Sequence, residues 1–219
     1  MRLRDRLGIG PRRQRQAVRV MQAVMLFVVG VGVWDGEPKV IINAGVALGI
    51  SFLVPVLERD YGIPLDAGIT LWITVAVFLH AFGTIGFPPG TTSLYQSVWW
   101  WDHMTHALSS SVVAGVGYAT VRALDEHSRE IHLPPRFVFV FILLFVLAYG
   151  VFWEILEFAI GQAAGAFGVG SVLTQYGLED SMKDLVFNTI GAVVVTLWGT
   201  AHLNDVSGYI RERLDQRAT

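Results

Sequence analysis

The sequence predicts an all-helical, polytopic integral membrane protein with six membrane-spanning helices. Its residues are 53% hydrophobic and only 16% charged, whereas a soluble domain carries about 25% charged residues. The apolar residues also gather in six segments, each close to the roughly 20 helical residues that cross the hydrocarbon core of a bilayer. The mean hydropathy of +0.51 agrees with this class.

The predicted spans lie between a basic arm over residues 1–16 and a polar tail over residues 205–219. After the arm, the apolar stretch continues to Trp34 without a convincing cleavage site, so we expect an uncleaved first span rather than a signal peptide. We treat residues 17–204 as one domain. The spans are expected near residues 17–34, 39–57, 66–86, 102–122, 136–162 and 182–203.

The links between spans differ in positive charge, and this difference predicts the orientation. The arm, the tail and the link after span 4 each contain several arginines, and the link after span 2 contains Arg59, whereas the opposite links carry only Lys39 and Lys183. Lys and Arg are enriched in cytoplasmic loops of membrane proteins. We therefore expect both termini to be cytoplasmic, which agrees with an even number of spans.

The most distinctive stretch is Trp99–His106, where three tryptophans run into an acid and two histidines. Tryptophan prefers the membrane–water interface, so span 4 should begin there. Asp102 and His106 are i,i+4 neighbours, and His103 and His106 are i,i+3 neighbours, so all three share one helix face.

With this orientation, four spans place polar groups in the same outer layer. Ionisable residues inside a membrane usually face the helix bundle or a water-filled cavity. The spacing therefore predicts a polar pocket that opens to the outer face and is built by spans 3 to 6. Its expected members are His80 in span 3, Asp102, His103 and His106 in span 4, Glu154 and Glu157 in span 5, and Asp180, Asp184 and Asn188 at the start of span 6.

These residues resemble the YjdF-like family of prokaryotic inner-membrane proteins, whose activity is not settled. The matching motifs are His80-Ala-Phe-Gly83, Trp101-Asp102-His103-x-x-His106, Glu154-x-x-Glu157, Thr174-Gln175 and Asp180-x-x-x-Asp184-x-x-x-Asn188-x-x-Gly191. The same skeleton is more distantly similar to the VanZ-like family. His103 departs from both, because YjdF-like proteins tend to have Arg there and VanZ-like proteins Lys. The resemblance implies a multi-pass protein of the prokaryotic plasma membrane.

One interpretation of the pocket is a divalent metal site. The chain contains no cysteine, and a set of carboxylates and imidazoles suits Zn²⁺, Mn²⁺ or Fe²⁺. We predict Asp102, His106, Glu154 and Asp184 as ligands and Glu157 as a general base. The groups expected to orient the ligands are His103, Asp180, Asn188 and His80. The protein would then be a metal-dependent enzyme that acts on a membrane lipid or cell-envelope precursor.

Two other interpretations use the same residues. The pocket could bind or transport a cation or a small envelope molecule without catalysis, although the inner halves of the spans show no matching polar path. Alternatively, the polar groups could form an interhelical network, with Asn188 and His106 bonding across helices and Lys183 pairing with Glu154. The net charge of −2 gives no basic field for nucleic acid, so membrane lipids are the expected surroundings.

Overall fold

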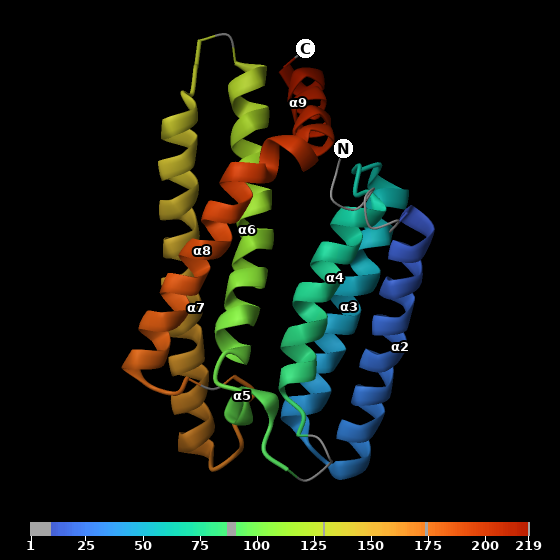
Figure 1. Ribbon diagram of the computed structural model, residues 1–219, viewed down its shortest axis with the longest axis vertical. Coiled ribbons are helices and arrows are strands. Elements are labelled where there is room, and N and C mark those ends of the chain that lie inside the picture. The colour runs from blue at the N-terminus through green and yellow to red at the C-terminus, as the bar shows by residue number, and fades with distance from the viewer. Residues whose placement is uncertain (1–9, 87–90, 129, 174, 219) are drawn as a thin grey trace. The chain divides into compact units, whose positions relative to one another are not determined.

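The computed structural model describes residues 10–86, 91–128, 130–173 and 175–218, and these ranges contain eight helices. The helices are α2 (Pro11–Asp35), α3 (Pro38–Tyr61), α4 (Ala67–Gly83), α5 (Leu94–Ser97), α6 (Trp101–His127), α7 (Pro135–Phe167), α8 (Leu178–His202) and α9 (Asn204–Ala218) (Figure 1).

The prediction of an all-helical membrane protein is confirmed. Each of the six segments expected to span the membrane coincides with a helix, α2, α3, α4, α6, α7 or α8. Four of these, α2, α3, α6 and α7, are long and apolar enough to cross a bilayer, and α4 is a shorter apolar helix of 17 residues. The count of six spans and the orientation of the termini stay predictions.

The helix ends differ from the sequence-based expectation at several places. The arm contributes its last residues to α2, and α5 forms inside the link before span 4. Helix α7 continues to Phe167, and α8 begins at Leu178, so the predicted link of residues 163–181 is shorter than expected. Gly168 and Gly177 lie at its ends with positive φ angles of 65° and 114°, a conformation that favours glycine. The early start of α8 puts Asp180 in its first turn.

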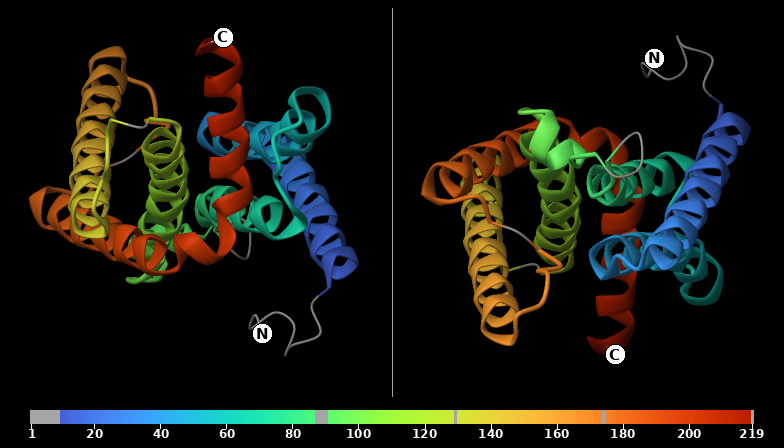
Figure 2. Two further views of the ribbon diagram at one scale, coloured as in Figure 1. Left: turned by 90° about the horizontal axis from the view of Figure 1, so that it is seen from above. Right: turned by 90° about the horizontal axis from the view of Figure 1, so that it is seen from below.

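The chain divides into two compact units. The first comprises the residues up to Asp102 together with Ile160–Leu173. Within it, α2, α3 and α4 each pack against the other two (Figure 2). Their shared core consists of small and aliphatic side chains, namely Met25, Val28, Ala44, Ala47 and Ala81.

The second unit comprises His103–Ala159 and residues 175–218. Its helices approach closely at glycines. A Cβ on Gly117 of α6 would lie 3.0 Å from the Phe145 ring of α7, and one on Gly150 of α7 would lie 2.7 Å from Nδ2 of Asn188 in α8. Gly191 of α8 lies directly against the Ala107 carbonyl of α6. These close approaches bring the polar turns of the three helices within reach of one another.

Candidate metal centre

The centre of the candidate site is the contact between Asp184 on α8 and His103 on α6. The Nδ1–H of His103 donates to Oδ1 of Asp184 at 3.0 Å. Both residues are buried, with exposed fractions of 1% for Asp184 and 6% for His103. The His103 ring also stacks on Phe187, with the centroids 4.9 Å apart and the planes 10° from parallel. Two residues of α8 therefore hold the imidazole of His103: Asp184 bonds its Nδ1 and Phe187 stacks on its ring face.

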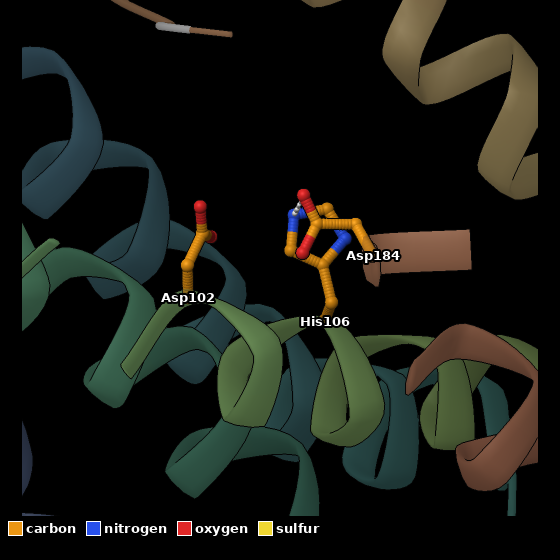
Figure 3. A group of neighbouring side chains, drawn as sticks. All are labelled: Asp102, His106 and Asp184. Atoms are coloured by element: carbon orange, nitrogen blue, oxygen red, sulfur yellow. Dashed lines mark ion pairs between the residues drawn. The ribbon is translucent and has the colours of Figure 1, made fainter. Parts of the chain in front are cut away.

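The second oxygen of Asp184 faces His106. The distance from His106 Nε2 to Asp184 Oδ2 is 3.8 Å, and the Asn188 side chain hydrogen-bonds His106. Figure 3 shows this pair, with Asp102 on α6 beside His106. The boundary between the two units falls after Asp102, inside α6. Because Asp102 and His106 belong to one continuous helix, they remain neighbours one turn apart.

Asp180 adds a second carboxylate on the His103 side. One ligand atom each from His103, Asp180 and Asp184 lie within 4.8 Å of one another. The backbone N–H of Tyr176 donates to Asp180 Oδ2 at 3.2 Å. Burial raises the pKa of Asp180 above its usual range, and the Glu154 charge raises it further, while the Tyr176 N–H and His103 oppose this effect.

Glu154 on α7 offers a buried carboxylate oxygen. Gln175 Nε2 donates to its Oε2 at 3.3 Å and to Ser181 Oγ at 2.9 Å. Glu154 is only 8% exposed, yet its Oε1 has no hydrogen-bond partner among the described residues. Such an unsatisfied buried oxygen is costly in a folded protein. Glu154 was predicted as a metal ligand, but it belongs to neither of the two sets of ligand atoms that lie within 4.8 Å of one another among the described residues.

Glu157 and Asn188 have defined partners. Trp153 Nε1 donates to Glu157 Oε1 at 2.9 Å within α7, and Glu157 is also 8% exposed. The backbone carbonyl of Asn188 accepts from Ser110 Oγ at 3.2 Å, which joins α8 to α6. The predicted role of Glu157 as a general base stays a prediction.

His80 lies in the first unit, in a network of its own. Asn43 Nδ2 donates to the carbonyls of Lys39 at 2.8 Å and Val172 at 3.1 Å, so its Oδ1 is left to accept from His80 Nε2 at 3.2 Å. His80 Nδ1 then accepts from the Tyr95 hydroxyl at 2.8 Å. The role of His80 in orienting metal ligands stays a prediction.

The tryptophans that precede the site lie in different surroundings. Trp99 is 80% exposed, as expected for a side chain at a membrane interface. Trp101 instead donates from Nε1 to the Leu79 carbonyl at 3.2 Å and packs against Gly83, where a Cβ would also lie 2.6 Å from the Tyr95 ring. The glycine of the His80-Ala-Phe-Gly83 motif thus leaves room for two aromatic rings.

Several of these contacts have no signal in the sequence. Asn43, Tyr95, Ser181 and Phe187 were not expected at polar sites, because each is a common residue in an ordinary helix or link. Gln175 belongs to a family motif, but its bond to Glu154 depends on how the link folds back on α7. Lys183 pairs with exposed Glu179 at 2.7 Å, which lowers the pKa of Glu179, and not with Glu154 as one interpretation proposed.

The fold and the buried polar groups define a helical membrane protein with buried ionisable side chains on α6, α7 and α8. The chain belongs to the family described as "Predicted membrane protein (DUF2238)", whose model matches residues 17–205. This is the YjdF-like family that the motifs indicated, so that prediction is confirmed. The resemblance to the VanZ-like family stays a prediction.

One curated relative comes from Thermotoga maritima and is described as "Uncharacterized protein". It is 31% identical over 122 residues, which cover 55% of this chain and 56% of the relative. The chain therefore matches the relative over about half of the relative's length. No solved structure matches the chain.

Proposed function

We propose that the protein is a metal-dependent enzyme of the prokaryotic plasma membrane that acts on a membrane lipid or cell-envelope precursor. The observation that carries this proposal is the set of ligand atoms from His103, Asp180 and Asp184, which lie within 4.8 Å of one another at largely buried positions. A divalent ion bound there would offset the repulsion between the carboxylates.

The donor set fits a divalent transition metal. Imidazole nitrogen and carboxylate oxygen bind Zn²⁺ at about 2.0 to 2.2 Å, so two ligand atoms of one ion lie about 3 to 4 Å apart. The His103–Asp184 contact of 3.0 Å and the His106–Asp184 contact of 3.8 Å fall in this range. Glu154 is kept as a proposed further ligand because its buried Oε1 has no hydrogen-bond partner among the described residues, although it lies outside both sets of close ligand atoms.

The residues divide into ligands and supporting groups. Asp184, His106, Glu154 and Asp102 are the ligands predicted from sequence, and the contacts of His103 and Asp180 with Asp184 support adding these two. Gln175 and Asn188 would hold Glu154 and His106 in place. A bound dication supplies a water of lowered pKa. Glu157 is proposed to take the proton from that water.

The charges of the links support a site at the outer side of the membrane. With both termini cytoplasmic and six spans, the first turns of α6 and α8 face outward, since the arginine-rich links lie on the other side. The substrate would then be a head group or precursor reached from the outer leaflet.

Metal content tests the metal part of the proposal. The full chain is purified in detergent without chelator, beside Asp184→Asn and the control Glu179→Gln, which alters an 84% exposed side chain one turn away. We expect near-stoichiometric Zn, Mn or Fe in the wild type and the control, and a loss of metal in a folded Asp184→Asn. Absence of metal from the wild type, even after dialysis against each ion, would contradict the site.

A second experiment separates catalysis from binding or transport. The metal-loaded protein is reconstituted in vesicles of total bacterial polar lipids, and lipid products are measured by mass spectrometry beside uptake of Mn²⁺. Lipid conversion that is lost in Asp184→Asn is the expected result. Mn²⁺ uptake that depends on Asp184, without lipid conversion, would instead establish the transport alternative.

A further inference from the structure

Both oxygens of the Asp184 carboxylate face an imidazole. Oδ1 lies 3.0 Å from Nδ1 of His103, and Oδ2 lies 3.8 Å from Nε2 of His106. The two histidines are three residues apart on α6, so they flank the carboxylate from neighbouring turns. A carboxylate placed in this way can give one oxygen to each of two ions.

Each imidazole also has a second carboxylate beside it. Asp180 lies in the set formed with His103 and Asp184, and the carboxylate of Asp102 lies within 4.8 Å of a ring nitrogen of His106. Asp102 and His106 stand on adjacent turns of α6 (Figure 3). The two sides of Asp184 therefore repeat one pattern, with one imidazole and one aspartate on each side.

The charge of the cluster points to more than one dication. Asp102, Glu154, Asp180 and Asp184 supply four carboxylates. The segments 101–121, 145–160 and 175–191, which carry them, contain Lys183 as their one Lys or Arg, and its ammonium pairs with Glu179. The Oε1 of Glu154 is also buried without a partner among the described residues, although Glu154 belongs to neither set of close ligand atoms.

We infer that Asp184 bridges two divalent ions, one held by His103 and Asp180 and the other by His106 and Asp102. Two-ion sites of enzymes hold their ions about 3.5 to 4 Å apart, a separation that the two oxygens of one carboxylate can bridge. This inference rests on the proposed metal function and goes beyond it by assigning a second ion and its ligands.

Titration with Mn²⁺ tests the number of ions. The full chain in detergent is titrated with Mn²⁺ alone, and bound ion is followed by equilibrium dialysis and electron paramagnetic resonance. We expect two equivalents per chain, with the second equivalent suppressing the hyperfine-split signal of an isolated ion through spin coupling. Asp102→Asn and Asp180→Asn should each bind one equivalent with the isolated-ion signal, Asp184→Asn should bind neither tightly, and Glu179→Gln should bind two.

The outcomes separate this inference from the proposed function. One equivalent in the wild type, with an isolated-ion signal, would overturn the second ion and leave a single metal site. Two equivalents retained in both Asp102→Asn and Asp180→Asn would overturn the assigned ligands. No bound Mn²⁺ in the wild type, and no Zn²⁺ or Fe²⁺ in the same dialysis, would overturn the proposed function as well. The wild-type signal decides the ion count even if a variant fails to fold.

Discussion

Asp184 of α8 and His103 of α6 make a buried contact of 3.0 Å across 81 positions of sequence. The contact gives each of these buried polar side chains a hydrogen-bond partner, and a buried polar group without one is costly. Phe187 packs on the imidazole face, and Gly191 lets α8 approach α6 two turns further along. The contact therefore depends on how α8 packs against α6, and the proposed metal centre is built around it.

Gln175 should affect metal affinity although it is not a ligand. Gln175 donates to Oε2 of Glu154, a proposed metal ligand whose Oε1 has no partner among the described residues. Loss of a group that orients a metal ligand typically costs 10- to 100-fold in affinity. We expect Gln175→Leu to weaken Mn²⁺ binding by about this factor, measured by equilibrium dialysis. The control Gln162→Leu changes an exposed glutamine of α7 and should bind as the wild type does. Equal affinities would show that Gln175 does not position Glu154.

The two glutamates of α7 should behave differently. Glu154 has a buried oxygen that lacks a partner in the described part of the chain, whereas Glu157 accepts from Trp153 Nε1 at 2.9 Å. We therefore expect Glu154→Gln to lower metal affinity at least 10-fold, as expected for a lost ligand. Glu157→Gln should keep its metal and lose turnover. Loss of metal in Glu157→Gln with none in Glu154→Gln would reverse the assignment.

The crossing of α6 and α8 should not tolerate a larger residue at Gly191. A Cβ there would overlap the Ala107 carbonyl and the Ser110 hydroxyl, and overpacking of this kind typically costs about 1 to 3 kcal/mol. We expect Gly191→Ala to lower the free energy of unfolding by this amount in detergent. Gly161→Ala is the matched control, because a Cβ on that helical glycine meets nothing within 4 Å. Equal stability of the two variants would mean that the close approach is absent.

The Tyr95 hydroxyl should stabilise the first unit. It donates to Nδ1 of His80 at 2.8 Å, and a hydrogen bond of this kind contributes about 0.5 to 1.5 kcal/mol. We expect Tyr95→Phe to lose roughly that amount of unfolding free energy, measured by denaturant titration in detergent. The control Tyr149→Phe also removes a tyrosine hydroxyl but keeps the ring that stacks on Trp153, so its unfolding free energy should stay close to that of the wild type. If Tyr149→Phe lost as much unfolding free energy as Tyr95→Phe, the His80 contact would not account for the stabilisation.

The helices and their polar faces could be predicted well from the sequence, because both depend on local spacing. Asp102 and His106 share a helix face as i,i+4 neighbours must, and Asp180, Asp184 and Asn188 follow one another at steps of four on α8. Asp184 was expected near the polar turns of span 4, and its carboxylate contacts His103 and lies 3.8 Å from His106 of α6. The residues that share one helix face follow from the helical period within a single segment.

The partners across helices could not be predicted in the same way. The sequence pattern favours His106 as a ligand and His103 as a supporting residue, yet His103 lies closer to Asp184. Which histidine lies closer to Asp184 depends on how far α8 is shifted along α6. The close contact of Gly191 with the Ala107 carbonyl limits that shift. The helical end of α7 differs from expectation for another reason. The span was expected to end near residue 162, but α7 continues to Phe167 through a segment with three alanines, and alanine is the strongest helix former.

The most direct test of the metal centre is anomalous diffraction from crystals of the full chain grown with Mn²⁺. We predict anomalous density within about 2.5 Å of an Asp184 oxygen and of Nδ1 of His103, at coordination distance, with the direct contact of these two side chains opened by the ion. Crystals soaked in Mn²⁺ that show no anomalous peak near Asp184, and keep the His103–Asp184 hydrogen bond, would contradict the metal centre.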